Sequence, residues 1–96
     1  MELSNIIKSF PKDFIFGTAT SSYQIEGTSY GGCGKSHWDS FSRKPDAVFG
    51  GHNGDIACNH IHNWENDLNL VSDAGFRAYR FSFSWPRLFV NGTMVQ

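Results

Sequence analysis

The chain has 96 residues, enough for one small domain, and this length excludes a large self-contained enzyme. It carries 8 Lys and Arg residues against 9 Asp and Glu residues, a formal net charge of -1, so it lacks the basic field that collects nucleic-acid phosphates. Hydrophobic residues make up 40% and charged residues 18%, a balance that favours a packed core over a disordered tail. We expect globular material with no nucleic-acid partner.

The N-terminal lead, residues 1–13, has no apolar run of signal-peptide length, because Lys8 interrupts Ile6 and Ile7. No segment approaches the roughly 18 consecutive apolar residues that a membrane span requires. Cys33 and Cys58 are too few for the disulfide framework of a small secreted domain, so we expect two reduced thiols. These features predict a cytoplasmic location and no membrane partner.

The first regular element is predicted at residues 14–20, FIFGTAT, where aromatic and β-branched residues favour a strand. Residues 27–54 contain repeated glycines and Pro45 and are predicted to be mostly loop, with one short helical turn around residues 36–41. Loops of this length in compact folds are usually functional. The segment is therefore a candidate wall of a binding site.

A helix is predicted over residues 56–74, with Asp55 as its N-cap and Gly75 as its C-terminal stop. Its apolar residues recur at helical spacing, at Ile61, Trp64, Leu68 and Val71. The following segment, residues 78–85 (AYRFSFSW), alternates aromatic and small or charged side chains, and this period of two predicts a strand.

Strand, helix and strand together predict an α/β fold whose residues 14–85 form one βαβ unit with parallel strands and a right-handed crossover. A parallel sheet needs cover on both faces and does not stop at two strands. We therefore expect the opening piece of a larger fold, in which residues 86–96 begin the next loop. Asn91-Gly92 within that loop is a hairpin signal.

No nucleotide, metal or other cofactor site is predicted. Residues 34–36 (GKS) lack the earlier glycine of a phosphate loop, because position 29 is Ser, and His37 stands where a dinucleotide fingerprint needs its third glycine. His60 and His62 point to different sides of the predicted helix, whereas helical metal ligands are spaced four residues apart.

Two polar residues are candidates for a site. Gln24 follows the carboxyl end of the first strand, where α/β barrels keep their active sites, and its amide can donate to and accept from a sugar hydroxyl. Arg80 lies on the polar face of the second strand and would point into a barrel interior, where an arginine persists beside a carboxylate. The alternatives are a solvent-exposed loop glutamine and a purely structural salt bridge.

Four segments occur in one order along residues 10–93: FPKDFIFGTATSSYQIEG, GKSHWDSF, NGDIACNHIHNWENDLNLVSDAGFRAYRFSFSWPRL and NGT. In this order and spacing they resemble the N-terminal part of glycoside hydrolase family 1, the β-glucosidase family. The resemblance implies a (β/α)₈ TIM barrel, of which this chain would hold the first two strands and the helix between them.

The resemblance also implies an activity, the retaining hydrolysis of β-glycosidic bonds in a β-glucoside or related small carbohydrate. The glutamine that matches Gln24 binds hydroxyls of the innermost sugar, and the arginine that matches Arg80 supports the nucleophilic carboxylate. The family's two catalytic glutamates lie in Thr-x-Asn-Glu-Pro and Glu-Asn-Gly motifs, neither of which occurs here, and Glu65 lies inside the predicted helix. We expect part of a hydrolase with no catalytic residue of its own; the alternative is a catalytically silent carbohydrate-binding or interaction module.

Overall fold

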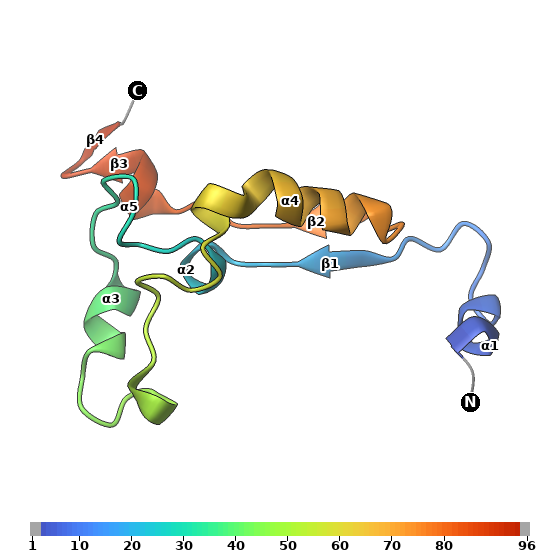
Figure 1. The fold of residues 1–96 in the computed structure, drawn as a ribbon, viewed down its shortest axis with the longest axis horizontal. Coiled ribbons are helices and arrows are strands. Elements are labelled where there is room, and N and C mark those ends of the chain that lie inside the picture. Colours follow the sequence, from blue (N-terminus) through green and yellow to red (C-terminus); the bar gives the residue numbers. More distant parts are fainter. Residues whose placement is uncertain (1–2, 95–96) are drawn as a thin grey trace.

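The computed structural model describes residues 3–94 and has the predicted α/β character (Figure 1). Its elements in chain order are α1 (Leu3–Lys8), β1 (Gly17–Ala19), α2 (Ser22–Ile25), α3 (His37–Ser42), the 3₁₀ turn η1 (Phe49–Gly51), α4 (His60–Asp73), β2 (Ala78–Arg80), α5 (Trp85–Leu88), β3 (Phe89–Val90) and β4 (Thr93–Met94). Among the described residues, no helix is long and apolar enough to span a membrane.

The two strands β1 and β2 form a parallel pair, which confirms the predicted βαβ arrangement. Their register joins Gly17 to Ala78 and Ala19 to Arg80. A Cβ atom on Gly17 would lie 2.8 Å from the carbonyl oxygen of Ala78, so glycine permits this close approach of the strands. Beyond the pair, the backbone N–H of Thr20 donates to the carbonyl of Arg80 at 2.9 Å.

Both strands are shorter than the sequence pattern predicts. The predicted second strand continued to Trp85, but β2 ends at Arg80 and Trp85 begins α5. The chain after β1 turns into α2, so residues beyond Arg80 lose the neighbouring backbone that a ladder requires. Pro86, at the first turn of α5, has the fixed φ that suits a helix start.

The long helix α4 runs alongside the two strands and ends as predicted (Figure 1). Gly75, at φ 84°, donates to the carbonyl of Ser72, and Phe76 donates to the carbonyl of Val71, the two bonds of a Schellman cap. The predicted start is wrong, because the N-cap is Asn59 rather than Asp55. Positive φ at Ala57 and Asn59 turns the chain before the helix begins.

Residues 27–54, called the connection below, are more ordered than a structureless loop. The bonds from Thr28 N–H to the Gly54 carbonyl (2.9 Å) and from Ser29 N–H to the Asp55 carbonyl (3.0 Å) close its two ends together. The predicted turn is present as α3, with Ser36 as its N-cap. Further along the chain, Asn91-Gly92 joins β3 and β4 as the expected hairpin.

No hydrophobic side chain among the described residues is buried. Large aromatic side chains are exposed to solvent, including Phe83 at 76% and Trp85 at 68%. The radius of gyration is 17.3 Å, whereas a compact domain of about 100 residues has about 13 Å. The strands and α4 therefore present apolar faces that these residues alone do not cover.

Candidate functional site

The candidate site lies at the carboxyl ends of β1 and β2. Because the two strands are parallel and Ala19 pairs with Arg80, the segments that follow them emerge at the same edge. Gln24 lies on α2, which begins three residues after β1, and Arg80 is the last residue of β2. The structure thus brings both sequence-predicted residues to one edge of the pair.

Gln24 is exposed on the single turn of α2 rather than in an irregular loop. Its Oε1 accepts a hydrogen bond from Ser21 Oγ at 2.8 Å, which leaves the amide NH₂ group available as a donor. Gln24 also lines an open surface hollow of about 250 Å³, together with Tyr23, Trp38 and Phe41. A polar amide beside aromatic rings suits a ligand that has hydroxyl groups and an apolar face.

Arg80 is exposed and its guanidinium makes one described contact, from Nη1 to the carbonyl of Thr20 at 3.0 Å. Among residues 3–94 no carboxylate lies within ion-pair distance of it. The internal salt bridge considered as an alternative is therefore not formed by the described residues. The remaining donors of this guanidinium are free to meet an anionic group outside them.

Tyr23, next to Gln24, anchors α2 to the connection. Its hydroxyl accepts from the Gly54 backbone N–H at 3.0 Å and bonds Ser42 Oγ at 3.0 Å, while that serine hydroxyl donates to the Asp39 carbonyl. A Cβ on Gly54 would lie 2.7 Å from the tyrosine ring, so only glycine allows this contact. The connection is thus held against the turn that carries Gln24.

Arg87 anchors the other end of the same turn. Its Nε donates to Glu26 Oε1 at 2.8 Å, and both side chains are 17% exposed. Nη1 donates to the carbonyl of Tyr30 at 2.8 Å, and Nη2 donates to the carbonyl of Gly27 at 3.2 Å. One guanidinium therefore joins α5, after β2, to the chain that leaves α2.

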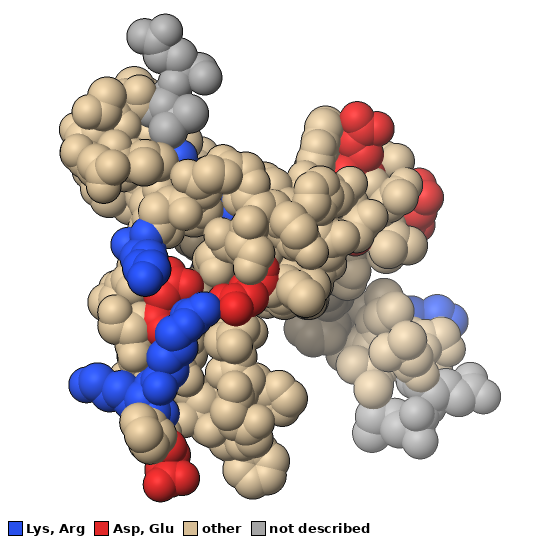
Figure 2. All heavy atoms as spheres, turned by 60° about the vertical axis from the view of Figure 1, so that its left-hand side comes forward, with Lys and Arg blue, Asp and Glu red and all other residues tan. Residues whose placement is uncertain are grey.

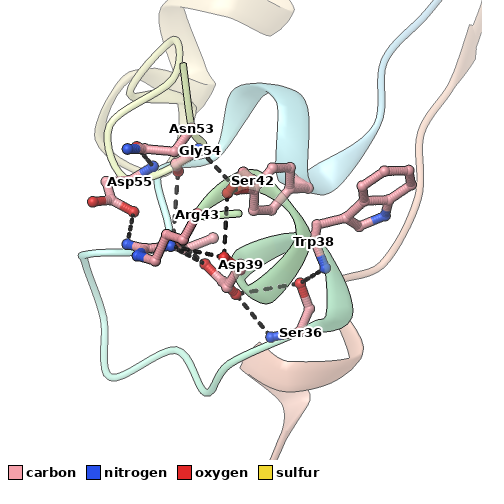
Figure 3. A network of polar contacts seen from close by, with 10 residues as sticks. Ser36, Trp38, Asp39, Ser42, Arg43, Asn53, Gly54 and Asp55 are labelled. Carbon is pink, nitrogen blue, oxygen red and sulfur yellow. Dashed lines mark hydrogen bonds and ion pairs between the residues drawn. The ribbon is translucent and has the colours of Figure 1, made fainter. Parts of the chain in front are cut away.

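A polar network around α3 stiffens the connection (Figure 3). Asp39, 6% exposed, accepts through Oδ2 from Ser36 N–H at 2.7 Å, while Ser36 Oγ accepts from Trp38 N–H at 3.2 Å, which completes a capping box. Arg43 donates to Asp55 Oδ1 at 2.7 Å, and this hydrogen bond raises the pKa of the guanidinium above its ordinary value.

Positively and negatively charged side chains lie close together on the connection, around α3 (Figure 2). Arg43 approaches Asp39 at 3.7 Å and Asp55 at 2.7 Å there. In these two ion pairs the charge of Arg43 is offset by the carboxylates of Asp39 and Asp55.

The histidines discounted as metal ligands have other contacts. His60 Nδ1 lies 2.7 Å from Asp67 Oδ2, and His62 Nδ1 lies 2.6 Å from Asn59 Oδ1. Both cysteines are free, as expected, with Cys33 Sγ 3.8 Å from Ser84 Oγ. Within residues 3–94, no three His, Cys, Asp or Glu side chains gather as a metal site would require.

Sequence reasoning missed Tyr23, Glu26 and Arg87 as parts of this edge. Glu26 and Arg87 are 61 residues apart, and no local periodicity links residues at that separation. One signal in the sequence could have predicted this ion pair. Glu26 and Arg87 carry opposite charges and follow the carboxyl ends of two strands predicted to be parallel.

Comparisons with known proteins agree with this architecture. The family model described as glycosyl hydrolase family 1 matches residues 6–96. Beta-glucosidase A of Acetivibrio thermocellus is 51% identical over 86 residues, which cover 88% of this chain and 19% of that protein. The beta-glucosidase of Agrobacterium sp. is 55% identical over 84 residues, which cover 86% of this chain and 18% of that protein.

A solved structure gives the same result in three dimensions. The virulence factor SghA of Agrobacterium tumefaciens, in complex with its substrate analogue salicin, superposes with a TM-score of 0.80 at 50% identity. The match covers 88% of this chain and 19% of that one. The chain therefore spans about a fifth of the length of the relatives that it matches.

Proposed function

This chain belongs to glycosyl hydrolase family 1, and on that premise we propose that it supplies part of the sugar site of a β-glucosidase-like enzyme that hydrolyses β-glycosidic bonds with retention. Its fold is the N-terminal piece of a (β/α)₈ barrel, as the resemblance implied. We assign residues 14–85 to the first βαβ unit of the barrel and residues 86–96 to the loop that follows it.

The observation that carries the proposal is the position of Gln24 and Arg80 at the carboxyl edge of a parallel pair. Active sites of (β/α)₈ enzymes are built at this edge, from residues contributed by several strands. In a complete barrel, Gln24 would bind sugar hydroxyls with its amide, and the free donors of Arg80 would face the nucleophilic carboxylate contributed by a later strand.

Retaining hydrolysis requires two carboxyl groups about 5 to 5.5 Å apart, one acting as acid and base and the other as nucleophile. The 96 residues contain neither glutamate motif of the family. The contribution of this segment is therefore binding and electrostatic support. A nearby cation favours the ionised form of a carboxylate, so Arg80 would keep the nucleophile charged.

The proposal is tested in a complete barrel, made by replacing the matched N-terminal segment of the Agrobacterium sp. beta-glucosidase with residues 6–96; this protein is called the chimera below. Replacing Gln24 by Ala should reduce kcat/KM for an aryl β-glucoside by about 100-fold, or about 2.7 kcal/mol, because sugar hydroxyl contacts strengthen as the ring distorts toward the transition state.

The matched control is Asn69→Ala, which removes an exposed amide from α4 and should leave kcat/KM within about twofold. A folded Gln24→Ala chimera whose kcat/KM also stays within about twofold would show that Gln24 is a solvent-exposed residue without a role in substrate binding.

A further inference from the structure

The turn that carries Gln24 depends on contacts outside itself. α2 has four residues, and within residues 3–94 the side chain of Gln24 is bonded only to Ser21, just before the same turn. A single helical turn has little stability of its own in water. Its position over the strand ends must therefore be fixed by residues that link it to other elements.

Glu26, the C-cap of α2, is where those links meet. Its N–H donates to the Ser22 carbonyl at 2.9 Å, and its own carbonyl accepts from Ile61 N–H in the first turn of α4 at 3.2 Å. Its carboxylate accepts from Arg87 at 2.8 Å. Glu26 thus connects α2 to α4 through the backbone and to α5 through the side chain.

Arg87 makes three side-chain hydrogen bonds across this edge. Its three guanidinium nitrogens each donate to a different acceptor: Glu26 Oε1, the Gly27 carbonyl and the Tyr30 carbonyl. The backbone is shaped around this group, because a Cβ on Gly31 would lie 2.7 Å from Nη1 and Gly31 has φ 70°. A planar fork of fixed donors loses less conformational freedom per bond than a flexible ammonium group would.

We propose that Arg87 is a positioning residue for Gln24: through Glu26 and the carbonyls of Gly27 and Tyr30 it fixes α2 relative to β2 and so sets the place of the Gln24 amide. The inference rests on the proposed function, because it requires Gln24 to bind the sugar. Arg87 itself is assigned no contact with substrate. Displacing a substrate-binding group by about 1 Å can cost about 100-fold in rate, so loss of this anchor should be visible in kinetics.

The test is a double-mutant cycle in the chimera, with an aryl β-glucoside as substrate. Arg87→Met should reduce kcat/KM by about tenfold or more when Gln24 is present, because it frees three acceptors and releases α2. In the Gln24→Ala background the same change should reduce kcat/KM by less than about twofold, since the group that Arg87 positions is absent.

Arg87→Lys should recover part of the lost kcat/KM, because an ammonium still pairs with Glu26 but does not span the three acceptors. The matched control is Arg77→Met, at the exposed residue before the opposite, amino end of β2, and it should change neither background. If Arg87→Met does not fold, Arg87→Lys and Glu26→Gln are measured in the same cycle.

Equal reductions of kcat/KM by Arg87→Met in both backgrounds would overturn the inference and make Arg87 a general stabiliser of the fold. Failure of the proposed function gives a different result. An inactive parent chimera, or one insensitive to Gln24→Ala, contradicts the proposed function itself, whereas a sensitive chimera with additive effects contradicts only the role of Arg87.

Discussion

The βαβ frame, formed by β1, α4 and β2, and the connection, residues 27–54, are held together in opposite ways. The frame leaves large apolar groups exposed, with Trp64 at 50% and Leu70 at 68%. The connection has a buried carboxylate, Asp39, whose partners Thr28, Ser36 and Arg43 all belong to the same segment. Among the described residues, no buried side-chain nitrogen or oxygen lacks a hydrogen-bond partner, whereas the large apolar side chains lack cover.

This difference shows that the βαβ frame, and not the connection, needs further strands and helices to cover its apolar faces. Strands of parallel sheets are covered on both faces in folded proteins, and the exposed face of this frame is the kind of surface that packs against further strands and helices. The polar groups of the connection already have their partners, and so does the Arg87 clamp, by which we mean Arg87 with its acceptors on Glu26, Gly27 and Tyr30. The contacts at the carboxyl ends of β1 and β2 are therefore made within the segment itself. The stability of the fold depends on further strands and helices that cover the apolar faces of the frame.

The largest expected effect separates the 96-residue chain from the chimera. By itself the chain should hydrolyse no aryl β-glucoside, because it contains neither glutamate motif, and it should show no sharp thermal unfolding as a monomer, because its apolar faces lack cover. Circular dichroism, gel filtration and a glucosidase assay on the purified chain check this. Turnover abolished by a mechanism-based inhibitor would contradict the predicted lack of activity. A cooperative melt of a monomer would contradict the predicted lack of a stable fold and favour a self-contained binding module.

The next effect concerns the free donors at the strand edge. In the chimera, Arg80→Met should raise the pKa of the nucleophilic glutamate, because a nearby cation lowers that pKa and its loss reverses the effect. The acidic limb of the kcat/KM profile should move to higher pH by about one unit, equivalent to about 1.4 kcal/mol. An unmoved acidic limb in a folded variant would assign Arg80 a structural role through the Thr20 carbonyl.

A smaller effect is expected from the cap of α3. Ser36→Ala removes the hydroxyl that accepts from Trp38 N–H and should cost the chimera about 1 kcal/mol of unfolding free energy. Ser40→Ala, at an exposed position of the same helix, is the control and should be neutral or slightly stabilising. Equal unfolding midpoints for the two variants would mean that the network around α3 does not stabilise the connection.

The smallest effect is expected from the ion pair between Arg43 and Asp55. Both side chains are partly exposed, at 52% and 36%, so solvent and salt weaken their attraction. Asp55→Asn should lower the unfolding temperature of the chimera less than Ser36→Ala does, and the difference from the parent should shrink in high salt. A larger, salt-independent loss would show that this pair, rather than the capping box, holds the connection.

The frame was largely predictable from the sequence, because its signals are local. FIFGTAT and AYR predicted the parallel pair, and Gly75 predicted the end of α4. Outside the frame, Asn91-Gly92 predicted the hairpin of β3 and β4. The second strand was predicted too long, since alternation reports which side a residue faces and not whether a neighbouring backbone is present.

The site edge was only partly predictable. Gln24 and Arg80 followed from strand ends and from the family resemblance, but the clamp did not, because Arg87 meets Glu26 across 61 residues. The start of α4 was also missed. Asp55 has the chemistry of an N-cap, yet its carboxylate pairs with Arg43 and the chain turns at Asn59 before the helix begins.

The central claim, that this segment builds a working sugar-site edge of a family 1 barrel, is tested most directly by kcat/KM of the unmutated chimera for an aryl β-glucoside. The account predicts a folded barrel within about tenfold of the Agrobacterium sp. parent, or about 1.4 kcal/mol, because 55% of the matched residues are identical and the edge is organised by its own contacts. A folded chimera without measurable turnover would contradict it.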